Sequence, residues 1–385
     1  MTTAERPSEP AVRKVSVEDR RRLRQVVRDV TLFRVVFLAM GWLSVWMLVP
    51  DNVRPDFDLD LWHRWDAIHY TAIAQWGYAD FVAQGNGPGF LPGYPIAIRV
   101  VAWIPGVGAL VAAMALAFVG TIAAAFFLHK LAEHDGHSGD RAVLAMLLFP
   151  SAVFLVAPYS EALFLAVAIP AFYFARTQRP WYAVPLVFAA CLLRPVGPFL
   201  AFGVMVQVMQ GRWSLAGLRS RLAVLVAMGV AAVAPLAAHG IYLRERTGTY
   251  FSYFEAQERI SSRGFANPVD AFLTTADWDR TGVPASYLVA QQLEVLFVGL
   301  GLGVLVWLGL RREWGYAAYV GSTLASVMFS EFYLSVPRLS LSLFPFLFVI
   351  ADLADRPGWR ERLFPVMGCL SMLGVVIFTQ HLYFV

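Results

Sequence analysis

The chain has little charge for its size: charged residues make up 15% of its 385 residues, whereas hydrophobic residues make up 58%. A soluble domain typically carries about 25% charged residues. Apolar runs of about 17 to 25 residues recur instead, and that is the length a helix needs to cross ~30 Å of hydrocarbon. The short alternating strands of a membrane barrel do not appear. The sequence therefore predicts an all-α polytopic membrane protein, built as a helical bundle.

Cysteine is scarce, and the common nucleotide-binding motifs are absent. Cys191 and Cys369 both lie in apolar runs, so neither a disulfide framework nor a cysteine metal site is expected. There is no Walker pattern, Rossmann fingerprint or Gly-rich phosphate loop, which argues against direct use of ATP or a nucleotide sugar. No nucleic-acid partner is expected. No linker or internal repeat divides the chain, so residues 31–385 are predicted to form a single transmembrane domain.

Lysine is also nearly absent, with two lysines against 29 arginines, which indicates a GC-rich genome and a bacterial source. Residues 1–30 hold eight basic and five acidic residues and no apolar run. They are predicted to be a cytoplasmic tail that lies near anionic membrane lipids. The predicted location is therefore the plasma membrane, with the N-terminus inside the cell.

Eleven apolar segments are predicted to cross the membrane. They are residues 31–49, 107–129, 141–157, 160–177, 181–193, 196–210, 220–243, 287–310, 315–333, 338–354 and 361–384. A further piece, residues 91–104, carries Arg99 and is either a short span or a helix at the interface. If it does not cross, the arginine and lysine clusters of the short loops all fall inside, as the positive-inside rule requires. This arrangement is the one we expect.

The predicted topology places two large segments, residues 50–106 and 244–286, on the outer face. The first is too long for a simple connector, and its aromatic content argues against disorder. Within it, Asp66 and His69 are three residues apart, so a helix over residues 62–76 would present both on one face. A carboxylate at the boundary between water and lipid is well placed to act as a general base. The alternative is that Asp66 is a solvated or helix-capping residue.

Acidic residues occupy every second position just before the predicted helix over residues 62–76, at Asp56, Asp58 and Asp60. The pattern is similar to the metal-binding Asp-x-Asp of sugar-nucleotide enzymes. Alternating aspartates in an exposed loop are more often solvated. We therefore expect no metal site and no cofactor.

Three further charged residues lie at the outer ends of predicted spans: Glu161, Arg194 and Arg338. Each could be a helix cap or a side chain that reaches toward the interface. Charge inside a helical bundle is nevertheless costly, which makes such residues functional candidates. Two recessed arginines on one side indicate an anion, and the anion that a bilayer supplies is a lipid phosphate.

These residues also carry a family resemblance. Trp65-Asp-Ala-Ile-His-Tyr and the later Phe90-Leu-Pro-Gly-Tyr-Pro resemble the first outer loop of the PIG-V-type mannosyltransferases. Ala157-Pro-Tyr-Ser-Glu is similar to the family's Tyr-Ser-Glu corner, Leu193-Arg-Pro-Val-Gly to its Arg-Ser-Asn-Gly turn, and Pro337-Arg to its late Pro-Arg-Tyr motif. The chain departs from the family pattern at Pro195, Val196 and Leu339.

The resemblance implies a member of the GT-C glycosyltransferase superfamily, in which sugar is taken from a polyprenyl-phosphate carrier on the non-cytoplasmic face. It implies an inverting transfer of mannose to a lipid or glycan hydroxyl, with Asp66 as the base and His69 as its orienting partner. Arg194 and Arg338 would bind the leaving phosphate. The expected sugar or acceptor contacts are Trp65, Tyr159, Glu161, Gln257 and Arg259.

Two alternatives stay open. One is a related enzyme that uses another polyprenyl-phosphate sugar. The other is a lipid or sugar transporter (flippase). A transporter is expected to show repeated halves and charges spread along the depth of the bundle. Here no duplicated pattern is present and the charges gather at one face, which favours an enzyme.

Overall fold

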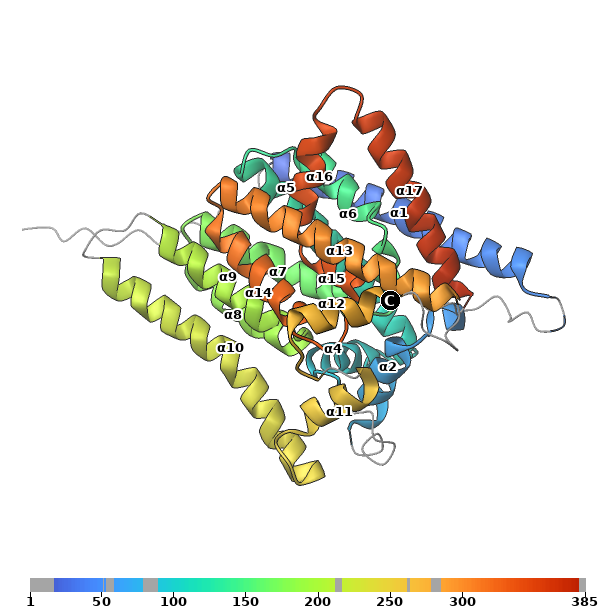
Figure 1. Cartoon of the computed structure of the whole chain (residues 1–385), viewed down its shortest axis with the longest axis horizontal. Helices are drawn as coiled ribbons and strands as arrows, with labels where there is room; N and C mark the ends of the chain where they lie inside the picture. Colours follow the sequence, from blue (N-terminus) through green and yellow to red (C-terminus); the bar gives the residue numbers. More distant parts are fainter. Residues whose placement is uncertain are drawn as a thin grey trace, which may run out of the picture.

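The computed structural model describes residues 17–50, 52, 59–78, 89–211, 217–261, 264–277 and 285–380. Within these residues the chain is a bundle of helices, and its only β pairing is an isolated bridge between Phe265 and Ser330 (Figure 1). The expected all-α class is therefore confirmed. The predicted tail lies partly outside the described residues, but its residues 17–30 are helical and continue into the first apolar segment.

Among the described residues, five helices are long and apolar enough to cross a membrane, or six if one bent pair is a single span. The five are α1 (Val17–Leu48), α5 (Ala109–His134), α10 (Leu218–Thr247), α13 (Ala285–Leu310, with the test met over residues 287–310) and α17 (Arg360–Thr379). The bent pair is α15 (Val336–Ser342) with α16 (Pro345–Ala354), which meet at 83°. These helices support an integral membrane protein.

The remaining predicted spans correspond to shorter or broken helices. They are α6 (Gly139–Leu147) with the 3₁₀ turn η4 (Ala152–Leu155), α7 (Glu161–Arg176), η5 (Pro180–Tyr182) with α8 (Ala183–Leu193), α9 (Gly197–Gln210) and α14 (Trp314–Met328). The expected continuous helix over residues 141–157 is interrupted at Pro150, and that over residues 338–354 is interrupted before Pro345. Proline lacks the N–H that a continuous helix needs at those positions.

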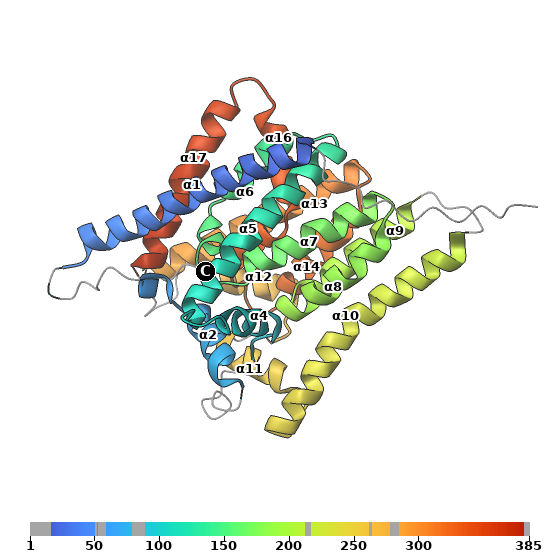
Figure 2. The ribbon, with the colours of Figure 1, turned by 180° about the vertical axis from the view of Figure 1, so that it is seen from behind.

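Short helices gather at one end of the bundle (Figures 1 and 2). They are α2 (Asp66–Trp76), α4 (Gly93–Ala102) and α11 (Ser252–Ser261). The 3₁₀ turn η2 (Leu59–Trp62) precedes α2 in the chain, and α12 (Pro268–Ala276) packs against α13 and α14. The helix predicted over residues 62–76 begins four residues late, because Trp65 takes a φ of +44°, which no α-helix tolerates. It ends before Gly77, as predicted, and there φ is +78°.

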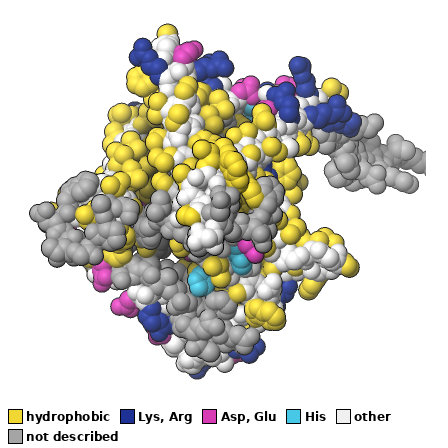
Figure 3. All heavy atoms as spheres, turned by 90° about the vertical axis from the view of Figure 1, so that its right-hand side faces the viewer, with side chains coloured by type: hydrophobic (Ala, Val, Ile, Leu, Met, Phe, Trp, Pro, Cys, Tyr) yellow, Lys and Arg dark blue, Asp and Glu magenta, His cyan; other side chains and the backbone are white. Residues whose placement is uncertain are grey.

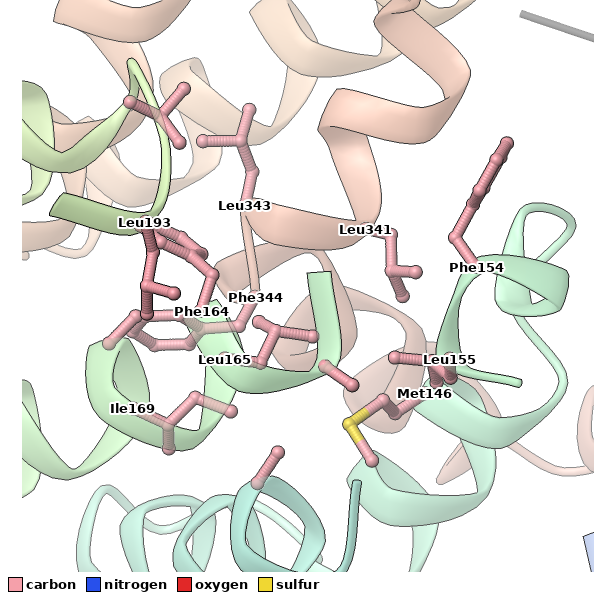
Figure 4. Close-up of a cluster of buried hydrophobic side chains, with 14 of the residues drawn as sticks. Met146, Phe154, Leu155, Phe164, Leu165, Ile169, Leu193, Leu341, Leu343 and Phe344 are labelled. Atoms are coloured by element: carbon pink, nitrogen blue, oxygen red, sulfur yellow. The ribbon is translucent and has the colours of Figure 1, made fainter. Parts of the chain in front are cut away.

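The central helices approach each other through small residues. A Cβ added to Gly120 on α5 would lie 2.9 Å from the backbone carbonyl of Ala162 on α7. Close backbone approach through glycine and alanine is a common way for membrane helices to pack. Figure 4 shows the adjoining core, where Leu165 of α7 lies near Phe344, and Leu341 of α15 points toward Leu155. This core supports the end of the bundle where the short helices gather.

The outer surface of the bundle is apolar over much of its area. On the face in Figure 3, hydrophobic side chains fill the middle and most charged side chains lie toward the upper and lower ends. On α10, Val226, Val230 and Val233 are each at least 60% exposed. Exposed valines in a row are costly in water and suit contact with lipid chains.

Candidate active site

Four charged side chains from four separate segments meet at the end of the bundle that carries the short helices. Arg338 of α15 pairs with Asp66 at the start of α2, with Nη1 2.6 Å from Oδ2. Its Nε donates to Oε1 of Glu161, at the start of α7, and Arg194, after α8, pairs with the same oxygen. The sequence placed these residues on one face, and the structure brings them into direct contact.

The cluster carries two positive and two negative charges, and it is largely shielded from solvent. The Glu161 side chain is fully buried, whereas the Asp66 side chain remains 31% exposed. Buried charges are tolerated when they are paired, because each ion lowers the desolvation cost of the other. Asp66 is thus the member of the cluster most accessible to a ligand from outside.

The guanidinium of Arg338 packs against two aromatic rings. Its guanidinium carbon is 4.6 Å from the ring centre of Tyr159 and 5.0 Å from that of Phe154. The Tyr159 hydroxyl donates to the carbonyl oxygen of Arg64 at 3.1 Å, which links the Tyr159 ring to the segment before Asp66. Contacts of this kind fix the plane of a guanidinium and strengthen when water is excluded.

Ser160 and Tyr70 belong to the cluster, although the sequence analysis did not assign them a role. Ser160 is fully buried, and its Oγ lies 3.2 Å from Nη1 of Arg194 and 3.3 Å from the Tyr70 hydroxyl. Burial raises the pKa of Tyr70 to about 12, so its hydroxyl stays protonated. The sequence did contain a clue to Ser160, since this residue is the serine of the Tyr-Ser-Glu motif that carries the family resemblance.

Glu294 of α13 is a third residue that the sequence analysis missed, because it lies alone in an apolar run. It is 1% exposed, and its two carboxylate oxygens accept the backbone N–H groups of Ser335 (3.0 Å) and Val336 (2.6 Å). Ser335 has a φ of +63°. Glu294 therefore fixes the tight turn that begins α15 and so sets the position of Arg338.

Trp65 lies immediately before Asp66 and holds an unusual backbone conformation, with φ +44° and ψ −117°. Its ring packs edge-on against Phe378 of α17, with centroids 5.1 Å apart. Strained residues of this type persist where the surrounding packing enforces them, and they cluster at functional sites. The strain turns the chain so that Asp66 starts α2 facing Arg338.

His69 follows Asp66 by one turn of α2, and its ring stacks on Phe90 with centroids 4.8 Å apart. Burial lowers the pKa of His69 below its ordinary 6.5, and the nearby negative charge of Asp66 opposes this shift only in part. The ring is therefore neutral at pH 7. A neutral imidazole can donate one hydrogen bond and accept another.

Gln257 and Arg259 lie on α11, in the second segment predicted to be outside. Gln257 Nε2 donates to the carbonyl oxygen of Gly89 at 2.5 Å, which joins the two segments. Arg259 is exposed. Among the residues that the structure describes, no three His, Cys, Asp or Glu side chains are grouped to hold a metal ion. Asp56 and Asp58 lie outside that set.

The chain is similar in sequence to mammalian GPI mannosyltransferases. Human GPI alpha-1,6-mannosyltransferase 2 is 34% identical over 138 residues, which is 33% of this chain and 27% of the human protein. The mouse and rat proteins of the same name match with the same identity and the same coverage. The matched region thus spans about a quarter of the length of these relatives.

A family model described as Mannosyltransferase (PIG-V) matches residues 47–256, more than half of the chain. That range includes Asp66, Glu161 and Arg194 and ends before Arg338. The chain belongs to the PIG-V mannosyltransferase family.

Proposed function

We propose that the protein is an integral membrane mannosyltransferase that takes mannose from polyprenyl-phosphate-mannose and transfers it, with inversion, to a hydroxyl of a glycolipid or glycan. The observation that carries the proposal is the cluster of Asp66, Glu161, Arg194 and Arg338 at one end of the bundle. It combines a partly exposed carboxylate with two guanidinium groups. A base and an anion-binding site are what a transfer from a phosphate carrier needs.

The reaction divides between the two halves of the cluster. The acceptor oxygen forms a bond to the anomeric carbon while the bond from that carbon to the phosphate oxygen breaks, and the electron pair stays on the phosphate. Asp66 accepts the hydroxyl proton as the new bond forms. Arg338 and Arg194 stabilise the charge that develops on the leaving phosphate. No metal ion or cofactor takes part in this scheme.

Substrate binding and release of the base are linked through Arg338. In the structure Arg338 pairs with Asp66. A phosphate that binds the guanidinium competes with this carboxylate, because Arg338 can present only one fork of donors in that direction. The donor therefore frees Asp66 for the acceptor hydroxyl, and His69 orients it.

The remaining predicted contacts serve the sugar and the acceptor. Trp65 and Tyr159 supply aromatic faces beside Asp66, and Glu161 holds both arginines in place. Gln257 and Arg259 are proposed to meet the acceptor from α11. An enzyme of the same kind that uses another polyprenyl-phosphate sugar would need the same cluster. The identity of the transferred sugar is therefore tested by comparing donors.

We further propose eleven crossings, with the cluster on the extracytoplasmic side and the N-terminus and residues 1–30 in the cytoplasm of a bacterial cell. Lys130, Arg176, Arg311 and Arg356 all lie at helix ends remote from the cluster. Positive charge on that side satisfies the positive-inside rule. The proposed setting is the plasma membrane.

A test supplies purified protein in lipid nanodiscs with a radiolabelled donor and a total lipid extract as acceptor. The donors are polyprenyl-phosphate-mannose, polyprenyl-phosphate-glucose and GDP-mannose, each at the same concentration. We expect label to enter the acceptor only from polyprenyl-phosphate-mannose, and the anomeric configuration of the product to be opposite to that of the donor. Transfer from GDP-mannose, or retention of configuration, would contradict the proposal.

The transporter alternative is tested with the same nanodisc protein moved into sealed vesicles. A flippase carries polyprenyl-phosphate-mannose across the bilayer without forming a new glycosidic bond. Movement of label between leaflets without a new product would favour transport, whereas the contact of Asp66 and Glu161 with two arginines at one site favours an enzyme.

A further inference from the structure

A second candidate site lies beside the charged cluster. It is a cavity of about 540 Å³ between α2, α4, α8 and α10, with Pro235 of α10 in its lining. Its lining is mostly apolar, with Ile73, Phe188, Leu192 and Ala238 among the walls. In Figure 2, α10 passes beside α8 and runs toward the short helices at the same end as α2 and α4. A cavity of this size holds part of a hydrocarbon chain.

One polar group inside the cavity has no partner. His239 of α10 is 6% exposed, and its Nε2 has no hydrogen-bond partner. The neighbouring Tyr78 ring lies 5.3 Å away, but the Tyr78 hydroxyl already donates to the carbonyl oxygen of Phe90 at 2.7 Å. A buried polar atom left unsatisfied is costly, by roughly 1–3 kcal/mol. A bound molecule with one polar group at this depth would remove that cost.

The rim of the cavity is positive. Arg99 of α4 is exposed and lines the cavity, and it donates through Nε to the carbonyl oxygen of Ala74 (2.6 Å) and through Nη2 to that of Ile73 (3.2 Å). A guanidinium has five donors, so the group retains capacity for an anion. Apolar walls, a polar atom at depth and a cation at the rim together match an anionic lipid.

Two helices pack closely at the side of the cavity formed by α4 and α8. A Cβ on Gly93 of α4 would lie 2.6 Å from the carbonyl oxygen of Leu192, so α4 and α8 are in backbone contact there. The buried rings of Tyr70 and Tyr94, 5.0 Å apart, fill the space behind. The contact of α4 with α8 closes the cavity on one side.

We propose that this cavity binds the lipid part of the acceptor: an anionic glycerolipid with one acyl chain along α8 and α10. Its ester carbonyl or hydroxyl lies at His239 Nε2, and its phosphate lies at Arg99. Ile73 is seven residues from Asp66 along α2, about 10 Å at 1.5 Å per residue. A sugar headgroup on such a lipid spans that distance to the base. The assignment to the acceptor rests on the proposed transferase function; the lipid site does not.

The test compares two tryptophan variants on adjacent exposed positions of α10. Ala238→Trp fills the cavity, whereas Ala237→Trp adds the same bulk at a position that does not line it. Delipidated protein in detergent is mixed with phosphatidylglycerol or with diacylglycerol, and retained lipid is counted by native mass spectrometry. We expect one phosphatidylglycerol on the wild type and Ala237→Trp, at least tenfold less on Ala238→Trp and severalfold less on His239→Leu. Equal retention by the two tryptophan variants, or equal retention of diacylglycerol, would overturn the proposal.

Kinetics then decide which substrate uses the cavity. We expect Ala238→Trp to raise the KM for the acceptor lipid at least fivefold and to leave the KM for the donor unchanged. A rise in the donor KM instead would overturn the assignment to the acceptor. If no protein transfers mannose while the lipid counts follow the expected pattern, the proposed transferase function fails and the lipid site stands.

Discussion

Removal of Arg338 is expected to destabilise the protein more than removal of any surface arginine. Arg338→Met keeps a long apolar side chain against Phe154 and Tyr159 but leaves Asp66 and the fully buried Glu161 with one counter-ion fewer. Loss of one partner from a buried ion pair costs about 3–5 kcal/mol, because the remaining charge is left uncompensated. At ~1.4 kcal/mol per tenfold, the unfolding equilibrium shifts by about 10² or more.

The assay is chemical unfolding in mixed micelles, with Arg311→Met as the matched control. Arg311 pairs with Asp352 at 2.7 Å, but its side chain is 48% exposed, so its removal is expected to cost no more than about 1 kcal/mol. Adding Asp66→Asn to Arg338→Met removes the carboxylate that has lost its ion pair, whereas Glu161 keeps Arg194, and is expected to restore about 1 kcal/mol. Equal losses for Arg338→Met and Arg311→Met, or no restoration by Asp66→Asn, would refute the account of a buried, charge-balanced cluster.

Three further outcomes follow from the site. Glu294→Gln turns an NH₂ group toward the N–H of Ser335 or Val336, and the protein loses a charge-assisted hydrogen bond of roughly 1.5–3 kcal/mol. We expect kcat to fall at least tenfold in the transfer assay. An unchanged kcat would show that Glu294 does not position Arg338. Because burial lowers the pKa of His69 below 6.5, the unfolded chain binds its proton more tightly, and stability is lost as pH falls below that value. His69→Phe is expected to flatten the fall in unfolding midpoint between pH 7 and pH 5, and parallel curves for the two proteins would argue otherwise. Transfer is expected to persist in excess EDTA, whereas loss that Mg²⁺ or Mn²⁺ restores would require a metal.

The sequence predicted the class of fold and the end of the molecule where the charges lie, because both depend on local pattern. Apolar runs of spanning length require helices, and the alternation of basic loops assigns Asp66, Glu161 and Arg194 to one side. The pairing of Arg338 with Asp66 and Glu161 could not be read from the chain, since it depends on how four distant segments pack. Glu294 was missed for the same reason: its partners are backbone groups 41 and 42 residues away.

The helix boundaries were predicted less well than the helices themselves. Hydropathy alone joined residues 141–157 and residues 338–354 into continuous spans, although Pro150 and Pro345 were visible in the sequence as points of interruption. The late start of α2 at Asp66 was not visible, because the positive φ of Trp65 is imposed by packing that the local sequence does not encode.

The measurement that tests the central claim most directly is single-turnover transfer of mannose by the purified wild type, Asp66→Asn and Asp60→Asn. Asp60 is exposed and stands in the same loop, so it controls for loss of a carboxylate near the site. We expect Asp66→Asn to slow transfer by about 10²–10⁴-fold with the donor still bound, since general-base catalysis contributes on that scale, and Asp60→Asn to leave the rate nearly unchanged. Transfer by Asp66→Asn at the rate of the wild type would contradict the assignment of Asp66 as the base.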